Sequence, residues 1–314
     1  MIRDLPDTNA TEISAALRTA RRALGIPAVG MVLTLIIVTD EAGLEGALAA
    51  ASKTAREHPS RILAVIEGPP DAQTTSGEAA RLDTEIRICS EVGAGETVVL
   101  WLSGEVVAHA DSVVLPLLVP EAPVVVWWPG AGPANPAAHP LGALANRRVT
   151  DVAAAASPLK HLTRRSQTYT PGDTDLAWTR TTPWRSILTA ALDRHPAPVQ
   201  RAVVESEPED GSGILLAAWL AERLQVPVEH AAATGSPLAV RLHSGDGDIT
   251  LARTSPSTAG LSTPDHPDQC AAMPQADTAE LISEELRRLE PDDVYGTALK
   301  HSSAVAASPA RTSA

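Results

Sequence analysis

The residues with the most direct potential for metal chemistry are two Asp-x-Asp doublets, Asp173-Thr-Asp175 and Asp246-Gly-Asp248. Paired carboxylates are the ligands that hard divalent cations prefer. The same spacing is common in turns, where an aspartate accepts hydrogen bonds from nearby backbone amides. The nine histidines and two cysteines of the sequence form no His-x-x-x-His or Cys-x-x-Cys pair. We therefore expect both doublets to form turns, and we expect no bound metal.

A phosphate-binding loop is the second possibility. Gly211-Ser212-Gly213 lies between a predicted strand and a predicted helix, where a dinucleotide-binding fold carries Gly-x-Gly-x-x-Gly. Position 216 is Leu216, so the third glycine is missing, and the sequence contains no Walker-type loop or Gly-x-Ser-x-Gly motif. A strand-to-helix connection is the simpler interpretation, and no cofactor is expected. A small-molecule- or nucleotide-binding α/β protein, or an enzyme that uses this loop, remains the alternative.

Residues 147–185 differ from the rest of the chain in composition. They contain seven Lys and Arg residues against three Asp residues, and six of the eight aromatic residues fall between positions 101 and 184. Tryptophan and arginine dominate the energetic centres of protein interfaces, because both bury a large area and make directional contacts. We therefore expect Trp178 to be an exposed anchor for a partner, with Arg180 and Arg185 beside it.

The other tryptophans and one loop give further candidates. Trp184 lies on the apolar face of a predicted helix and is expected in the core. Trp127 and Trp128 point to opposite faces of a strand end, so at most one is expected to be exposed, and Trp128 is the candidate. The loop His58-Pro-Ser-Arg61 joins a helix to a strand. It either ends the helix at its proline or presents His58 and Arg61 to a partner.

The elements that position these residues follow from the hydrophobic pattern. An amphipathic helix is expected over residues 9–24, and the β-branched run Val32–Thr39 is typical of a strand buried on both faces. Helix and strand then alternate, which favours a mostly parallel, three-layer sheet. The predicted strands of this half are Val32–Thr39, Arg61–Ile66, Arg81–Ser90, Thr97–Leu102 and Val124–Trp128, with a helix near His109–Leu118. Cys89 falls in the third strand and is expected to be a buried apolar residue.

The second half is also predicted to be α/β, with a mixed sheet. Helices are expected after Pro183, at Ile214–Leu224 and at Glu280–Leu289, and strands at Arg201–Glu205, Ala259–Ser262 and Gln269–Met273. Leu238–His243 and Ile249–Arg253 flank Ser-Gly-Asp-Gly-Asp, which predicts a β-hairpin. We expect an N-terminal α/β domain over residues 1–168, a C-terminal α/β domain over 169–300, and a disordered tail over 301–314.

Charge and composition exclude several functions. The 25 basic residues face 38 acidic ones, a net charge of −13, so a nucleic-acid or membrane-surface role is disfavoured. No apolar run approaches the roughly 18–20 residues that span a bilayer. The first seven residues lack the basic and apolar pattern of a secretory signal, and the two cysteines suit a reducing compartment. A cytoplasmic location is expected.

Several blocks, in this order and at this spacing, resemble the glucose-6-phosphate dehydrogenase assembly protein family (OpcA). The resemblance extends from about Val29 to Leu299. It rests on Leu33–Asp40, His58–Arg61, Ala80–Arg87, His109–Leu118, Pro123–Pro129, Gly172–Arg180, Pro183–Arg185 and Glu284–Leu289. It implies a non-catalytic protein that binds glucose-6-phosphate dehydrogenase, helps it reach its active oligomer and so supports the oxidative pentose phosphate pathway.

Overall fold

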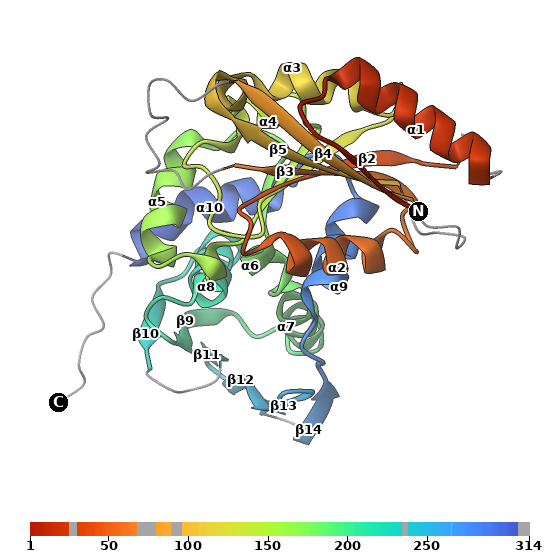
Figure 1. Cartoon of the computed structure of the whole chain (residues 1–314). Helices are drawn as coiled ribbons and strands as arrows, with labels where there is room; N and C mark the ends of the chain where they lie inside the picture. The colour runs from red at the N-terminus through yellow and green to blue at the C-terminus, as the bar shows by residue number, and fades with distance from the viewer. Residues whose placement is uncertain (25–29, 68–79, 89–95, 234–237, 265, 307–314) are drawn as a thin grey trace. The chain divides into compact units, whose positions relative to one another are not determined.

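The computed structural model describes residues 1–24, 30–67, 80–88, 96–233, 238–264 and 266–306 (Figure 1). The chain forms two compact units. Unit 1 comprises residues 1–150 and 278–291, and unit 2 comprises residues 151–277 and 292–314. Each unit has its own sheet and helices, which confirms the predicted α/β class. Over the described ranges, no helix has the length and apolar character needed to cross a membrane.

The sheet of unit 1 is mostly parallel. Its strands are β1 (Ile2–Leu5), β2 (Leu33–Thr39), β3 (Ser60–Ile66), β4 (Arg81–Ile88), β5 (Glu96–Ser103), β6 (Val124–Trp127) and β7 (Arg147–Thr150). Within unit 1 they lie in the order β1-β4-β5-β3-β2-β6-β7. In this order, each neighbouring pair from β5 through β3, β2 and β6 to β7 is parallel. Strand β4 runs antiparallel to both of its neighbours, β1 and β5. The apolar run in β2 is buried along nearly its whole length, as a central parallel strand requires.

Helices flank this sheet, as the three-layer prediction requires. They are α1 (Ala10–Leu24), α2 (Leu44–Thr54), α3 (Ala110–Val114), α4 (Pro140–Ala143) and α9 (Thr278–Arg287), with short 3-10 helices η1 (Gly104–His109), η2 (Leu115–Leu117) and η3 (Pro136–Ala138). Asn9 caps α1, since its Oδ1 accepts hydrogen bonds from two backbone amides of the first turn. The helix expected near His109–Leu118 is observed as α3 followed by η2, with η1 before it. Pro116 lacks a backbone N–H and so interrupts the α-helical hydrogen bonds after α3.

Unit 2 packs helices against a second, mixed sheet. Its elements are η4 (Val152–Ala154), α5 (Pro158–Thr168), β8 (Asp173–Asp175), α6 (Leu176–Thr179), α7 (Thr182–Arg194), β9 (Val199–Ser206), α8 (Gly211–Leu224), β10 (Val228–Ala232), β11 (Ala239–Ser244), β12 (Gly247–Ser255), β13 (Thr258–Thr263), β14 (His266–Ala272) and α10 (Asp293–Ala306). The strand order of the second sheet is β10-β9-β11-β12-β13-β14, with β10 parallel to β9 and the other pairs antiparallel. The predicted hairpin is confirmed as β11–β12, and Gly247 after its turn has a φ of 128°.

The division between the units differs from the expected domain boundary at residue 168. Helix α5 packs against α8 and α10, so the chain already belongs to unit 2 before that residue. The prediction of a disordered tail from residue 301 is wrong as far as residue 306, because α10 continues there and buries Ser302 and Val305. Residues 307–314 lie outside the described part of the chain, as does Cys89.

Candidate functional site

The segment Pro171–Arg185 is anchored in unit 2 by the side chain of Asp175. This residue ends β8 and is completely buried. Its carboxylate accepts hydrogen bonds from the backbone N–H groups of Ala177 at 2.9 Å and Val152 at 3.2 Å. Arg165 of α5 supplies the opposite charge, with Nη1 2.6 Å from Oδ2 of Asp175. The carboxylate therefore caps α6 and ties the start of the segment to α5.

The side chains of the two Asp-x-Asp doublets contact groups of the chain itself. Asp173 Oδ2 accepts a hydrogen bond from the backbone N–H of Thr170 at 2.9 Å, which is the turn-forming contact expected from the sequence. Oδ1 of Asp248 lies 2.9 Å from Nδ1 of His243, across the β11–β12 hairpin. Within the described residues, no three His, Cys, Asp or Glu side chains are grouped to hold a metal ion.

Trp178 is buried, so the prediction that it is an exposed anchor is wrong. The residue is only 1% exposed. Its Nε1–H donates a hydrogen bond to Oδ2 of Asp292 at 2.8 Å, and its ring lies 5.9 Å from that of Tyr295. The polar neighbours of Trp178 in the sequence suggested a surface position. Trp178 belongs to α6, which is too short to show a helical period, and that single turn directs the indole inward.

The two arginines of the segment are half-buried and have partners. Arg180 forms a bidentate pair with Asp151, with distances of 2.8 and 2.7 Å. Burial lowers the pKa of Arg180, but the hydrogen bonds and the charge of Asp151 outweigh it, so the pKa is raised overall. The guanidinium of Arg185 lies 3.7 Å above the centre of the Trp178 ring. It also donates hydrogen bonds to the hydroxyl groups of Thr181 and Thr182.

The candidates from the loop 58–61 are placed differently from each other. Arg61 is buried in β3, where its Nε donates a hydrogen bond to Glu96 at 3.1 Å and its Nη1 donates to the carbonyl of Leu117 at 2.6 Å. Burial lowers the pKa of Arg61, and Glu96 opposes that shift. The expectation that Arg61 faces a partner is therefore wrong. His58 is half-buried in the turn between α2 and β3, and its Nε2 is buried without a hydrogen-bond partner among the described residues.

Trp128 is also buried and cannot present its ring to a partner in this conformation. It is 4% exposed, and its ring meets that of His139 edge-on at 5.5 Å. Trp127, which precedes it, is buried as well. The reason is that both faces of the sheet are covered at the end of β6, so the alternation of side chains leaves neither indole outside.

The glycine loop at the start of α8 is filled by the protein's own side chains. A side chain on Gly211 would meet Cγ2 of Val152 at 2.7 Å, and one on Gly213 would meet Oγ of Ser206 at 2.2 Å. Asp210 caps the helix by accepting hydrogen bonds from its first amides. Burial raises the pKa of the Asp210 carboxyl, although these hydrogen bonds oppose the shift. The glycines thus permit close packing, and a carboxylate already holds the amides that would bind a phosphate.

Ser206 and His230 form a buried pair behind this loop. Oγ of Ser206 lies 2.8 Å from Nε2 of His230. Burial lowers the pKa of His230, and the charge of Asp210 opposes that shift. A hydroxyl beside an imidazole is the start of a nucleophile–base arrangement. However, Ser206 is 1% exposed and its hydroxyl packs against Gly213, so the contact belongs to the packing of β9, β10 and α8.

Sequence reasoning did not select Trp101, which is only half-buried. It lies on β5 directly opposite Asp83 of β4, and its Nε1–H donates a hydrogen bond to Glu41 at 2.7 Å. The sequence of the neighbouring strand β4 does indicate that this face of the sheet is open. In β4, Arg81, Asp83, Glu85 and Arg87 alternate with buried residues, and this pattern is typical of a sheet with one open face.

Two family models match the chain. The model for the N-terminal domain of the glucose-6-phosphate dehydrogenase subunit matches residues 51–167, and the model for the C-terminal domain of the same subunit matches residues 171–299. Together they cover more than half of the sequence. The chain belongs to this glucose-6-phosphate dehydrogenase subunit (OpcA) family. The resemblance stated from the sequence is confirmed, and the segment Pro171–Arg185 opens the family's C-terminal domain.

The other comparisons add little to this family assignment. No curated protein matches the chain. Among solved structures, a 3-ketoreductase from Actinomadura kijaniata has 11% identity and a TM-score of 0.47, and covers 87% of this chain and 96% of its own. An NAD binding oxidoreductase from Klebsiella pneumoniae has 8% identity and a TM-score of 0.48, with 88% and 95% covered. Similarity at this level does not extend the reductase activities to this member of the OpcA family.

Proposed function

We propose that this protein is a non-catalytic factor that binds glucose-6-phosphate dehydrogenase and favours its active oligomer. The observation that carries the proposal is the match of both family domains, over residues 51–167 and 171–299. Such a factor supports the oxidative pentose phosphate pathway and acts in the cytoplasm with its partner.

The polar clusters described above act within the fold of unit 2. The carboxylates of Asp175 and Asp210 hold backbone amides, and Arg165 and Arg180 form ion pairs within unit 2. These groups stabilise the fold of unit 2. Among the earlier candidates for the interface, His58, Arg180 and Arg185 are only half-buried, and we retain these three as candidates.

The proposed mechanism is a population shift. A factor that binds the active oligomer of the dehydrogenase more tightly than its other forms moves the equilibrium toward that oligomer. The shift cannot exceed the difference between the two affinities, and the dehydrogenase in turn must bind the factor more tightly when it is in the active form. Activation is therefore expected to be largest at dehydrogenase concentrations where the active oligomer is a minor species.

The deciding experiment combines co-purification with an activity assay. The full chain is mixed with the purified dehydrogenase of the same organism, and the complex is isolated by size-exclusion chromatography. We expect the rate of NADP reduction with glucose 6-phosphate to rise when the chain is added, and the dehydrogenase oligomer to become larger. The chain alone is expected to show no turnover.

Two results would contradict the proposal. If the chain neither co-elutes with the dehydrogenase nor changes its rate over a wide concentration range, the binding role is wrong. If the chain oxidises glucose 6-phosphate after complete removal of the dehydrogenase, the non-catalytic role is wrong.

A further inference from the structure

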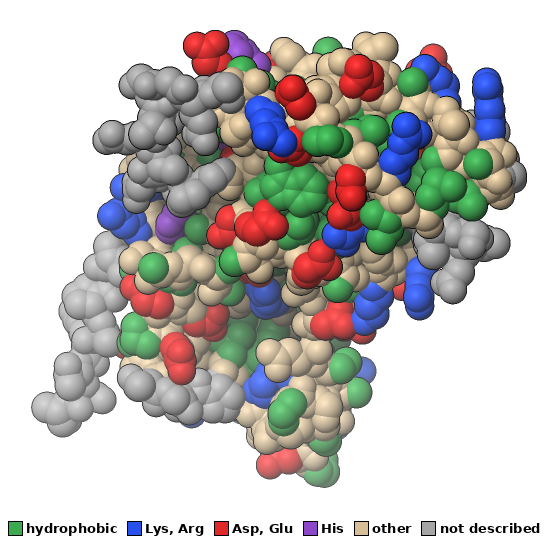
Figure 2. All heavy atoms as spheres, viewed as in Figure 1, with side chains coloured by type: hydrophobic (Ala, Val, Ile, Leu, Met, Phe, Trp, Pro, Cys, Tyr) green, Lys and Arg blue, Asp and Glu red, His purple; other side chains and the backbone are tan. Residues whose placement is uncertain are grey.

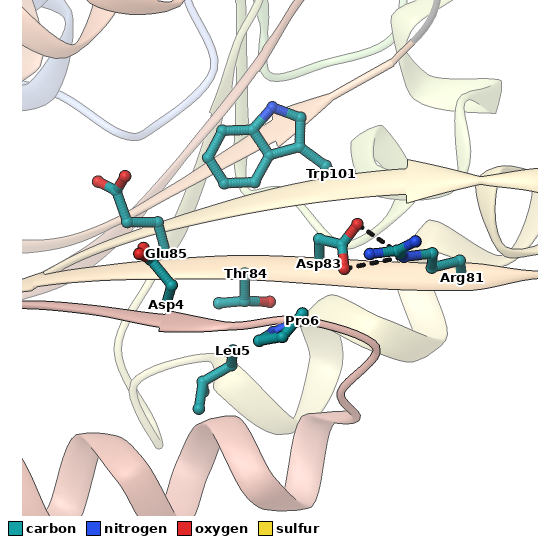
Figure 3. A pocket seen from close by; sticks show the side chains of 8 residues that line it. All are labelled: Asp4, Leu5, Pro6, Arg81, Asp83, Thr84, Glu85 and Trp101. Atoms are coloured by element: carbon teal, nitrogen blue, oxygen red, sulfur yellow. Dashed lines mark hydrogen bonds and ion pairs between the residues drawn. The ribbon is translucent and has the colours of Figure 1, made fainter.

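A shallow hollow of about 230 Å³ lies at the edge of the unit 1 sheet, beside the end of β1 (Figure 3). It is lined by Asp4, Leu5, Pro6, Arg81, Asp83, Thr84, Glu85 and Trp101. On this face of the sheet, α2 packs against β2 and β3. Glu41 and Glu45, near the start of α2, bind Trp101 of β5 and Arg87 of β4. In Figure 2, acidic side chains surround hydrophobic ones over the same region of unit 1.

Two carboxylates face each other across the strands at this hollow. Asp4 of β1 is directly opposite Glu85 of β4 in the antiparallel register. Like charges in this position destabilise a strand pair. Glu85 is bound by Arg87, whereas Asp4 is exposed and takes part in no ion pair within the described ranges. A cation bound from outside would be attracted by both groups.

The half-buried indole of Trp101 provides a flat surface beside these carboxylates. Its position is fixed by the hydrogen bond from Nε1 to Glu41. Asp83, directly opposite on β4, is held by Arg81 through contacts of 2.9 and 3.0 Å. The face of an indole attracts cations, and a planar guanidinium can stack on it. The hollow therefore combines a stacking surface with excess negative charge.

Thr84 lies between Asp83 and Glu85 on β4, opposite Leu5 of β1, and is only 3% exposed. Successive side chains of a strand point to opposite faces, so the Thr84 side chain lies with those of Leu82 and Ile86 on the buried face of the sheet. The groups that the open face offers to a ligand are therefore the carboxylates of Asp4 and Glu85 and the indole of Trp101.

We propose that this hollow binds an arginine side chain presented by the protein partner. A guanidinium can stack on Trp101 and donate to the carboxylates of Asp4 and Glu85, because its N–H groups are arranged in a planar fork. The volume lies below the roughly 300–1,000 Å³ of sites for small molecules, and it suits one side chain. The proposal rests on the proposed function, since the partner is taken to be the dehydrogenase.

The first test uses the full chain and a minimal probe. N-acetyl-arginine amide is titrated into ¹⁵N-labelled protein, and the indole resonance of Trp101 is followed after assignment with a Trp101→Phe variant. We expect a saturable shift with the arginine amide and none with N-acetyl-citrulline amide, which has the same shape but no charge. Asp4→Asn is expected to weaken the arginine response. Equal responses to the two probes would overturn the proposal.

The second test measures the affinity of the full chain for the purified dehydrogenase. The double variant Asp4→Asn, Glu85→Gln is expected to raise the dissociation constant by about tenfold, because charge-assisted hydrogen bonds are lost. Glu105→Gln, which removes an exposed carboxylate outside the hollow, serves as the matched control and is expected to leave the affinity unchanged. Circular dichroism confirms that the variants are folded.

The outcomes separate this inference from the proposed function. If the wild-type chain binds the dehydrogenase and the double variant binds equally well, the assignment of the hollow is wrong while the proposed function stands. If the wild-type chain does not bind the dehydrogenase at all, the proposed function fails, and the named partner fails with it. The arginine and citrulline titrations then still decide whether the hollow recognises a guanidinium.

Discussion

At the scale of single residues, Trp178 and Trp101 illustrate two uses of the same side chain. Each indole N–H donates to a carboxylate, Asp292 for Trp178 and Glu41 for Trp101. Trp178 is enclosed between Tyr295 and the guanidinium of Arg185, so its whole ring contributes to the core of unit 2. Trp101 keeps part of its ring exposed beside the hollow. The first is a stability determinant, and the second is available to a partner.

Trp178→Ala is expected to lower the free energy of unfolding by about 3–5 kcal/mol, because it removes a large buried ring and leaves a cavity. It also leaves the carboxylate of Asp292 without its indole donor. Urea denaturation, followed by far-ultraviolet circular dichroism, measures the loss. Trp101→Ala is the matched control, and a loss below about 1.5 kcal/mol is expected because that ring is already partly exposed. Equal losses for the two variants would show that the burial of Trp178 is not what stabilises the segment.

At the scale of elements, the packing of α8 depends on the absence of side chains at its start. Gly213 allows the helix to approach Ser206 at the end of β9, and Asp210 caps the helix at the same point. The remainder of α8 carries a run of fully buried apolar residues, so a displacement of its first turn would disturb the core of unit 2. The strand-to-helix loop is therefore a packing device.

Gly213→Ala is expected to destabilise the protein by about 1–3 kcal/mol, because the added methyl group would lie 2.2 Å from Oγ of Ser206. Gly46→Ala is the control. Gly46 is also helical, in α2, and an added methyl group there meets nothing within 4 Å. That substitution is expected to stabilise by about 0.5–1 kcal/mol, the ordinary gain for glycine to alanine in a helix. Denaturant midpoints compare the two, and changes of the same sign would contradict the packing argument.

The hydrophobic pattern predicted the long elements well, because periodicity needs length. β2, α1, α8 and the β11–β12 hairpin lie close to their expected positions. The short elements β8 and α6 were not predicted, because three or four residues show no period. The error at Trp178 has the same origin. Arg61 was predicted at the start of a strand, but its burial was not, because the sequence does not reveal that Glu96, on another strand, neutralises it within the sheet.

At the scale of the whole molecule, the chain passes between its two compact units three times. It leaves unit 1 after Thr150, returns for residues 278–291, and then enters unit 2 again. The returning segment forms α9, which packs against α2, and Thr54 Oγ1 donates to the carbonyl of Ala279 at 3.1 Å. Unit 1 is thus complete only when a segment from the far end of the sequence has been added. The sequence predicted a single domain boundary, at residue 168, because local patterns do not show which sheet a helix near the end of the chain packs against.

The ion pair between Arg147 and Glu285 ties α9 to unit 1, and it provides a test of this interleaved arrangement. Both side chains are buried, and Arg147 also donates to the carbonyl of Glu290 at 2.9 Å. Glu285→Ala leaves the guanidinium buried without its opposite charge, which is expected to cost about 3–5 kcal/mol. Glu284→Ala, on the neighbouring position of α9, removes an exposed partner of Arg287 and is expected to cost less than about 1 kcal/mol.

Hydrogen exchange locates the effect of Glu285→Ala within the chain. Amide protection is expected to fall in α2 and β7, which belong to unit 1 with α9, while α8 of unit 2 keeps its protection. The physical reason is that α9 covers α2 and supplies the counter-charge to β7, whereas the core of unit 2 contains neither contact. Uniform loss of protection in both units would mean that they unfold as one cooperative body. Unchanged protection in α2 would mean that α9 contributes nothing to unit 1.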